Sequence, residues 1–275
     1  MAELYDILIL GAGPAGISAA LTAKARGRNT VILSAEPLNT PLAKAPHIAN
    51  YPGVAAMDGR QLLASMLGNV FEQGVPIHTG RVTNAVAFDG KFMVSQEQEV
   101  FEAKSLILCP GAQQGTKPLP GEAEYLGKGV SYCATCDGML YRGRHVAVLG
   151  LGSGAEKDAA FLKSIGCDVL LLTGAQAKDV EIIGADAVTA IRFGGREQPV
   201  DGVFILRDTV AADALLPGLD MAGGHIAVCP DMQTNIPGVF AAGDCTGRPY
   251  QVARAVGQGN VAALAADRYV KERET

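Results

Sequence analysis

A glycine-rich turn near the start of the chain constrains the fold most. The turn, GAGPAG at residues 11–16, follows an apolar run at residues 5–10 and precedes an alanine-rich stretch at residues 15–24. A second apolar run comes at residues 31–33. A strand, a glycine turn, a helix and a second strand within about 30 residues predict a βαβ unit of the dinucleotide-binding type.

Each glycine of this turn has its own physical reason. Gly11 permits the tight turn, Gly13 lets the backbone approach a pyrophosphate, and Gly16 allows the helix to pack closely on the strand. Glu36, just beyond the second strand, can accept hydrogen bonds from ribose hydroxyls. The alternative is a glycine turn that serves packing alone. The predicted dinucleotide contacts of this turn are Gly11, Gly13, Pro14, Ala15 and Gly16.

The same order of elements returns in the second half of the chain. A strand is expected at residues 145–149, a helix at 155–165 and a strand at 168–172, again with a glycine turn after the first strand. Between the two βαβ units, residues 81–88 and 91–95 flank an Asp-Gly pair and predict a β-hairpin. The chain therefore reads as an α/β protein with two similar openings.

Two breaks rich in proline and glycine suggest the domain boundaries. They lie at residues 117–122 and 215–224. We expect one discontinuous domain made of residues 1–117 and 207–275. The smaller inserted domain would be residues 118–206.

Composition excludes several classes of protein. The chain has 275 residues, 48% hydrophobic and 19% charged, so it can bury a core and is not disordered. A net charge of −5 argues against a nucleic-acid partner. No apolar run reaches the ~18 residues of a membrane helix. The first ten residues hold two acids and no basic residue, unlike a signal peptide, so the cytoplasm is the expected compartment.

The pair Cys133 and Cys136 has CxxC spacing, which suits thiol–disulfide exchange when it begins a helix. In a reducing compartment a disulfide here is more readily catalytic than structural. Zinc would need two further ligands, and a plain structural pair is the other alternative. Asp137 follows directly and could move protons or simply cap a helix. The other cysteines are isolated and suit small core positions: Cys109, Cys167, Cys229 and Cys245.

The segment TNIPGVFAAGD at residues 234–244 is similar to the second flavin-binding motif of flavoenzymes with two dinucleotide folds. In that motif the aspartate, here Asp244, bonds the ribitol chain, and the following helix points its amino end at the flavin ring. The alternative is a surface turn with an aspartate cap. FAD is therefore the expected cofactor.

The string SYCATCDG at residues 131–138, with GAGPAG before it and GVFAAGDC and PYQ after it, resembles the low-molecular-weight thioredoxin reductase family over essentially the whole chain. The resemblance implies a two-dinucleotide-domain flavoprotein, a Rossmann-like FAD domain with an inserted CxxC domain, acting as a homodimer on thioredoxin. Cys136 would face the flavin, Cys133 would attack thioredoxin, and Asp137 would donate a proton. Asn50 and Gln251 match flavin contacts. The other predicted FAD contacts are Ser34, Val82, Gly111, Gly243 and Val252.

The departures from that family concern the electron donor. NADPH enzymes carry arginines after the second strand of the inserted domain, yet no arginine occurs between Arg144 and Arg192. The inserted domain is also short. In these features the chain resembles the ferredoxin-dependent flavin thioredoxin reductases, so ferredoxin is the predicted electron donor. NADPH, NADH and a non-catalytic flavin redox sensor are the alternatives. Basic residues expected near the flavin, where acidic ferredoxin would dock, are Arg207, Arg248 and Arg254.

Overall fold

The computed structural model describes residues 3–112, 118–152, 154–207 and 212–274. The chain divides into two compact units, Met1–Gln114 with Ala211–Thr275 and, inserted between them, Gly115–Val210. The boundary expected at residue 117 falls outside the described residues. Among the helices that the structure describes, none is long and apolar enough to cross a membrane.

The first unit is built on a mixed sheet with the order β3-β2-β1-β6-β5-β4, and β16 pairs with the carboxyl half of β6. The pairs β1–β2, β2–β3, β1–β6 and β6–β16 are parallel, whereas β4–β5 and β5–β6 are antiparallel. The strands are β1 (Leu4–Leu10), β2 (Thr30–Ser34), β3 (Ile77–Thr79), β4 (Val82–Phe88), β5 (Lys91–Gln96), β6 (Glu99–Leu108) and β16 (Val239–Ala241).

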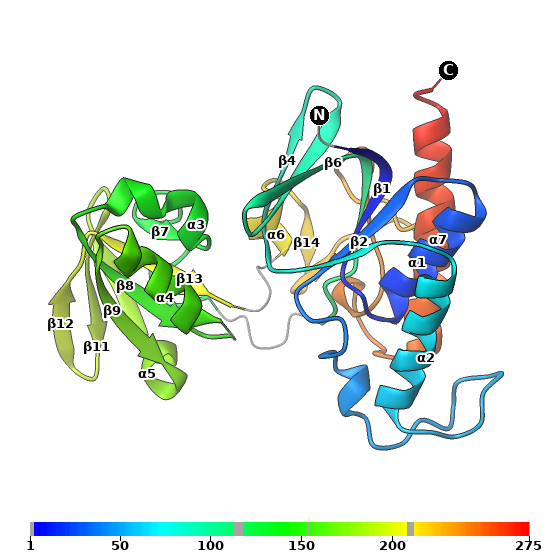
Figure 1. Ribbon diagram of the computed structural model, residues 1–275, viewed down its shortest axis with the longest axis horizontal. Coiled ribbons are helices and arrows are strands. Elements are labelled where there is room, and N and C mark those ends of the chain that lie inside the picture. Colours follow the sequence, from blue (N-terminus) through cyan, green and yellow to red (C-terminus); the bar gives the residue numbers. More distant parts are fainter. Residues whose placement is uncertain (1–2, 113–117, 153, 208–211, 275) are drawn as a thin grey trace. The chain divides into compact units, whose positions relative to one another are not determined.

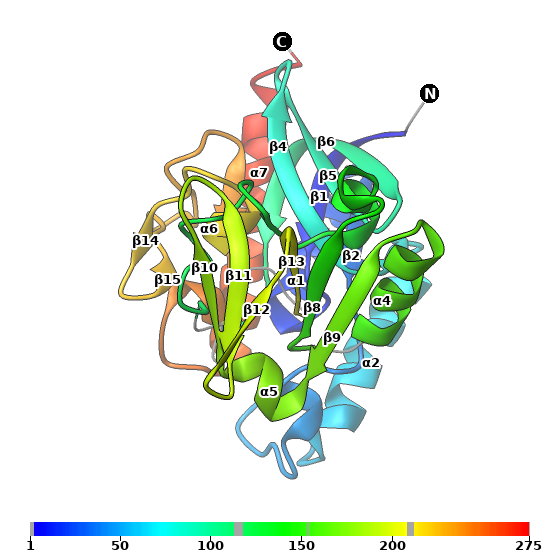
Figure 2. The ribbon, with the colours of Figure 1, turned by 90° about the vertical axis from the view of Figure 1, so that its left-hand side faces the viewer.

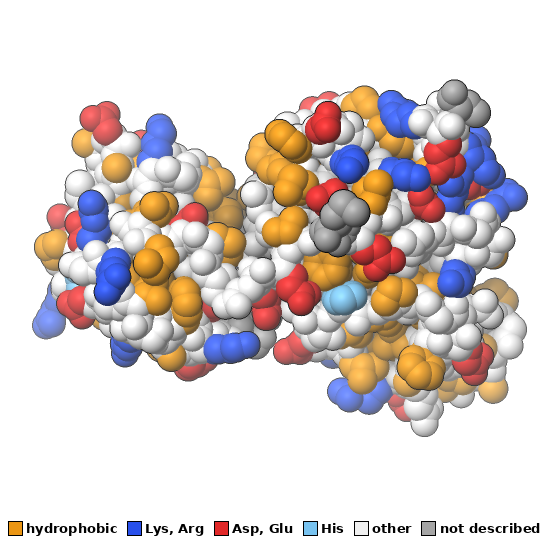
Figure 3. All heavy atoms as spheres, turned by 45° about the horizontal axis from the view of Figure 1, so that its top comes forward, with side chains coloured by type: hydrophobic (Ala, Val, Ile, Leu, Met, Phe, Trp, Pro, Cys, Tyr) orange, Lys and Arg blue, Asp and Glu red, His pale blue; other side chains and the backbone are white. Residues whose placement is uncertain are grey.

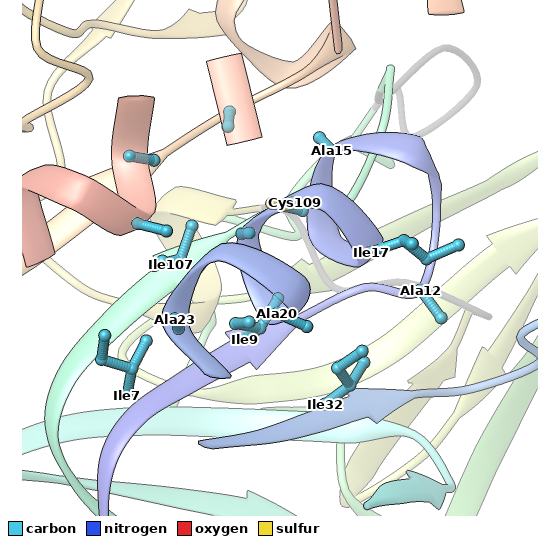
Figure 4. Packing of buried hydrophobic residues seen from close by; sticks show 14 of the residues in the cluster. Ile7, Ile9, Ala12, Ala15, Ile17, Ala20, Ala23, Ile32, Ile107 and Cys109 are labelled. Carbon is cyan, nitrogen blue, oxygen red and sulfur yellow. The ribbon is translucent and has the colours of Figure 1, made fainter. Parts of the chain in front are cut away.

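Three helices pack together in this unit, α1 (Pro14–Ala25), α2 (Gly59–Glu72) and α7 (Val252–Lys271), as Figure 1 shows. Figure 4 shows Ala20 and Ala23 of α1 lying over Ile7 and Ile9 of β1. Alanine is the smallest side chain with a Cβ, so this face of α1 lets helix and sheet approach closely. The carboxyl halves of β1 and β6, residues 7–10 and 106–108, are apolar and buried, as expected of parallel strands covered on both faces.

Helix α2 begins after Asp58, whose carboxylate accepts the Gln61 N–H at 2.9 Å. The remaining elements of the first unit are short. The short elements are η1 (Leu42–Lys44), α6 (Ala212–Leu215), β14 (Met221–Ala222), β15 (His225–Ile226) and η3 (Asp244–Thr246).

A buried ion cluster fixes the far end of α7. Arg28 donates to Asp267 at 2.7 Å and to Glu274 at 2.9 Å. The side chains of Arg28 and Asp267 are 9% and 4% exposed. Burial opposes the ionisation of Asp267, but hydrogen bonds from Lys271 and Arg28 outweigh it and hold its pKa below the ordinary value. The cluster ties the last turns of α7 to the start of β2.

The second unit has a parallel sheet with the order β7-β13-β8-β9 and a separate antiparallel sheet β10-β11-β12, both visible in Figure 2. The inserted domain was expected to be short, and the helix after β9, α5, has only five residues. The elements are β7 (Val130–Ser131), α3 (Ala134–Asp137), η2 (Gly138–Tyr141), β8 (His145–Gly150), α4 (Ala155–Ser164), β9 (Asp168–Thr173), α5 (Gly174–Lys178), β10 (Val180–Gly184), β11 (Val188–Phe193), β12 (Arg196–Pro199) and β13 (Gly202–Leu206).

Candidate dinucleotide and disulfide sites

The first glycine turn has the geometry that a bound pyrophosphate needs. Gly11 has φ +111°, a conformation that favours glycine. A side chain at Gly16 would run into the carbonyl of Gly11, whereas a Cβ at Gly13 would meet no protein atom within 4 Å. Pro14 occupies the first turn of α1, where a missing N–H costs nothing. Among the described residues, none lies within 4 Å of the open side of Gly13, so a ligand can approach its backbone.

The two ends of the chain meet at this turn. Gly243, two residues after β16, has φ +88°, and a Cβ there would lie 2.9 Å from the Cβ of Ala15. The Gly243 N–H donates to Gln258 on α7 at 3.0 Å. Since β1, β6 and β16 are parallel, the segments after their carboxyl ends share one edge of the sheet. Ligands of open α/β sheets bind at that edge.

Asp244 begins η3 at the same edge. Burial raises the pKa of Asp244, and the nearby Arg254 guanidinium offsets part of that rise. Arg254 donates to the Gly247 carbonyl at 2.6 Å and to Thr246 Oγ1 at 3.1 Å, so it also holds the loop before α7. Within the described part of the chain no salt bridge to Asp244 is seen, and a half-buried carboxylate of this kind suits hydrogen bonding to ligand hydroxyls.

The predicted flavin contacts Asn50 and Gln251 lie together although they are far apart in sequence. Asn50 Nδ2 donates to Gln251 Oε1 at 2.9 Å. Gln251 is the cap residue of α7, and its side chain does not cap the helix. The first backbone N–H groups of α7 therefore lack a side-chain cap and can face an electron-rich group.

The other predicted FAD contacts lie around the same edge. Ser34 ends β2, Gly111 follows β6 with φ +78°, and Val252 begins α7. Gly80 donates its N–H to the Ser34 carbonyl at 3.0 Å, which brings the start of β4 at Val82 near the end of β2. Glu36 is exposed and accepts a hydrogen bond from Asn39 at 2.9 Å. The residues present thus fit a dinucleotide with its pyrophosphate at α1.

In the second unit, Cys133 and Cys136 form a disulfide. Cys133 is the cap residue of α3, and its Sγ accepts the Cys136 N–H at 3.1 Å. Cys133 is 7% exposed, whereas Cys136 is exposed. A sulfur that accepts a backbone N–H is stabilised as a thiolate once the disulfide opens.

Asp137 is held next to the disulfide by a short relay. Ser131 Oγ accepts the Cys133 N–H at 3.0 Å and donates to Asp137 Oδ2 at 2.7 Å. The carboxylate is therefore oriented by the same residue that fixes the Cys133 backbone. In the described ranges no group of three or more His, Cys, Asp or Glu side chains could hold a metal ion.

The four other cysteines are free thiols in the structure. Burial raises the pKa of Cys245 to about 12 and lifts those of Cys109 and Cys167 as well. Such thiols stay protonated and unreactive near neutral pH. Cys229 is the exposed one of the four.

The second glycine turn, GLGSGA at residues 150–155, looks intact in sequence, but two of its backbone N–H groups are used inside the fold. Leu151 and Gly152 both donate their N–H groups to the Leu206 carbonyl, at 2.9 and 3.0 Å. Ser153 lies outside the described residues. Helix α4 then begins with the acidic residues Glu156 and Asp158 in its first turn. This arrangement presents negative charge where a dinucleotide would bring its phosphates.

Comparison with known proteins decides the family. Residues 5–179 and 172–259 match the family model "Pyridine nucleotide-disulphide oxidoreductase". A thioredoxin reductase of Listeria innocua is 30% identical over 98% of this chain and 95% of its own length. The chain belongs to the thioredoxin reductases of this family.

Two solved structures are similar over the whole reductase. A ferredoxin-flavin thioredoxin reductase from Clostridium acetobutylicum has a TM-score of 0.88 and 36% identity, covering 100% of both chains. A thioredoxin reductase from Gloeobacter violaceus has a TM-score of 0.78 and 33% identity, covering 99% of this chain and 96% of its own. The predicted fold class and the FAD cofactor are thereby confirmed.

Two features of this reductase escaped the sequence analysis. Met139 and Leu140, directly after the CxxC helix, are 56% and 73% exposed. Adjacent large apolar residues after a redox motif could have signalled a surface for a protein substrate. Arg207, expected near the flavin, is counted with the second unit, and its guanidinium pairs with Glu122. The Arg207 side chain is therefore buried rather than exposed. Its burial depends on Glu122, a partner that the local sequence does not reveal.

Proposed function

We propose that this thioredoxin reductase receives electrons from reduced ferredoxin rather than from NADPH, and that it acts as a homodimer in the cytoplasm. The observation that carries the proposal is the second glycine turn, where two N–H groups of Leu151 and Gly152 are bound to the Leu206 carbonyl. The similarity to the Clostridium acetobutylicum ferredoxin-flavin enzyme supports it.

Energetics favour a protein donor over a pyridine nucleotide. A hydrogen bond to a charged group contributes about 1.5–3 kcal/mol, so each lost phosphate contact weakens nucleotide binding about tenfold or more. No arginine occurs from residue 145 to residue 191 to pair with a 2′-phosphate. Glu156 and Asp158 add repulsion at the start of α4. NADH use remains the alternative, since missing arginines remove 2′-phosphate selectivity without forbidding NADH.

The chemistry at the disulfide follows from the chain's own residues. FAD held at the glycine turn before α1 and by Asp244 would supply the two electrons that reduce the Cys133–Cys136 disulfide. Two protons complete the reduction to a dithiol. One cysteine thiolate then attacks the thioredoxin disulfide and releases one thioredoxin thiolate. The second cysteine attacks the resulting mixed disulfide, which frees the other thioredoxin sulfur and re-forms Cys133–Cys136.

Asp137 is the residue that we assign to proton transfer at this dithiol. It lies one residue beyond Cys136, and Ser131 Oγ donates to it at 2.7 Å. The same serine accepts the Cys133 N–H, so the carboxyl position is coupled to that cysteine. We keep Cys133 as the cysteine that attacks thioredoxin and Cys136 as the one that faces FAD.

A protein substrate fits the surface around the disulfide. The exposed side chains of Met139 and Leu140 follow on η2, directly after the helix that carries the disulfide. An apolar pair beside a reactive sulfur gives an extended partner a place to bury surface. This surface supports thioredoxin as the partner over a small disulfide.

Steady-state turnover tests the donor. Thioredoxin reduction is followed as free thiols, with either dithionite-reduced ferredoxin or NADPH as the only source of electrons. The proposal expects turnover with ferredoxin and none above background with NADPH. Turnover with NADPH alone would refute it, and no turnover with any reductant would favour a non-catalytic flavin sensor.

Arg248 and Arg254 are basic residues in segments near the expected flavin site, where an acidic electron donor such as ferredoxin would dock. Arg254 is bound to its own loop, while Arg248 is exposed and lies 4.8 Å over the Tyr250 ring. On the face seen in Figure 3, basic and acidic side chains are interspersed over both units. Arg248 is therefore our candidate contact for ferredoxin.

A further inference from the structure

We propose that Glu122 positions the redox disulfide. Its buried carboxylate ties the segment that carries Cys133 to the two ends of the inserted unit. The inference rests on the proposed function, in which FAD and the Cys133–Cys136 disulfide exchange electrons.

Glu122 and Arg207 form a buried pair with two parallel hydrogen bonds. Arg207 Nη1 donates to Glu122 Oε1 at 2.6 Å, and Nη2 donates to Oε2 at 2.7 Å. The side chains are 10% exposed for Arg207 and 5% for Glu122. A bidentate pair has a fixed geometry, and a buried charge is strongly destabilised without its partner. The two segments that carry these residues are therefore held together.

The same carboxylate accepts two more hydrogen bonds. The Leu119 N–H donates to Oε2 at 2.7 Å, and the Tyr132 hydroxyl donates to Oε1 at 3.0 Å. Leu119 lies where the inserted unit begins and Arg207 near where it ends. One carboxylate thus joins the entry, the exit and the residue directly before Cys133.

Tyr132 matters because it lies between the two-residue strand β7 and Cys133. Strand β7 consists of Val130 and Ser131, which pair with β13 just before that strand reaches Arg207. The tyrosine hydroxyl adds a tie from this short strand to Glu122. Its loss should let Cys133 shift relative to the rest of the unit, while the Glu122–Arg207 pair stays in place.

Electron and disulfide exchange depend steeply on alignment, and a displacement of about 1 Å can cost up to ~100-fold in rate. We expect Tyr132→Phe, which removes only the hydroxyl, to slow electron transfer from FAD to the disulfide about tenfold. The matched control is Tyr125→Phe. Tyr125 belongs to the same core, and its hydroxyl donates to the Gly184 carbonyl at the end of β10 at 2.8 Å.

The test uses the FAD-loaded full chain under anaerobic conditions. Dithionite reduces the enzyme, so the result does not depend on the natural donor. Excess oxidised thioredoxin is then mixed in, and recovery of the visible flavin band is followed in time over a range of thioredoxin concentrations. In parallel, dithiothreitol reduces the Cys133–Cys136 disulfide and the free thiols are counted.

The inference expects a tenfold lower limiting rate for Tyr132→Phe, with the half-saturating thioredoxin concentration and the dithiothreitol reaction unchanged. Tyr125→Phe should stay within twofold of the unmodified chain. Equal rates for the two variants would overturn the inference, as would an equal slowing of the dithiothreitol reaction. Glu122→Gln should slow recovery at least as much as Tyr132→Phe, and if it fails to fold, Tyr132→Phe still decides. No recovery in the unmodified chain would refute the proposed function, and this inference with it.

Discussion

The substitution Gly13→Ala separates FAD binding from folding. Gly13 has φ −80° and ψ −178°, which alanine adopts without strain, and a Cβ there meets no protein atom within 4 Å. Alanine is a poorer helix cap than glycine by about 0.5–1 kcal/mol, but it lowers the entropy of the unfolded chain by a similar amount. The free energy of unfolding without cofactor should therefore change by less than about 0.5 kcal/mol.

The added methyl group points to the open side where the pyrophosphate is expected. Loss of one charge-assisted hydrogen bond to a phosphate costs about 2 kcal/mol, which corresponds to about a 30-fold higher Kd for FAD. Fluorescence titration of the cofactor-free protein measures the Kd, and thermal unfolding measures stability. Gly68→Ala is the control, because its Cβ also has open space, on α2. Unchanged FAD affinity in Gly13→Ala would refute the placement of the pyrophosphate at α1.

Three further outcomes follow from the structure. Cys136→Ser should trap a mixed disulfide between Cys133 and thioredoxin, visible by non-reducing electrophoresis, whereas Cys133→Ser should trap none; the reverse pattern would exchange their roles. Replacing Met139 and Leu140 by serine should raise the KM for thioredoxin about tenfold, since ~1.5 kcal/mol of apolar contact is lost, and leave a small disulfide substrate unaffected. Asp267→Asn should cost about 3 kcal/mol and lower the Tm by about 9 °C at pH 7. Because the pKa of Asp267 is held below 3.8, its stabilising effect is present at neutral pH and lost as the pH falls through that lowered value, so the difference in Tm between the two proteins should shrink in acid.

Local sequence patterns predicted the elements that bear the site. The glycine turn before α1, the parallel strand after it and the hairpin of β4 and β5 lie where the periodicity placed them. These signals succeed because a tight turn or an apolar strand depends on neighbouring residues. The amphipathic helix α2 was not predicted, although its Asp58 cap and its apolar residues at helical spacing were readable.

Contacts between distant segments could not be predicted in this way. Asn50 and Gln251 are 201 positions apart and share a hydrogen bond. Arg207 and Glu122 are 85 positions apart, and Arg207 looked like a surface charge until its partner was known. Tertiary packing decides which charge is buried and which is exposed.

The second glycine turn is another place where contacts with a distant segment could not be predicted from the sequence. Its sequence fits a dinucleotide site, and only the structure shows that the N–H groups of Leu151 and Gly152 are bound to the Leu206 carbonyl. The missing arginines were readable from sequence, whereas the occupied N–H groups were not. The missing arginines and the two occupied N–H groups together give a physical reason for weak nucleotide binding.

The most direct test of the account follows the visible flavin band of the FAD-loaded protein. The protein is mixed anaerobically with excess NADPH, then in separate samples with NADH and with reduced ferredoxin, and dithionite gives full bleaching as the reference. The account predicts that ferredoxin bleaches the band within the time of one turnover and that neither nucleotide does. Bleaching by NADPH on that timescale would contradict it, and rapid bleaching by NADH alone would show a nucleotide site that changed its specificity.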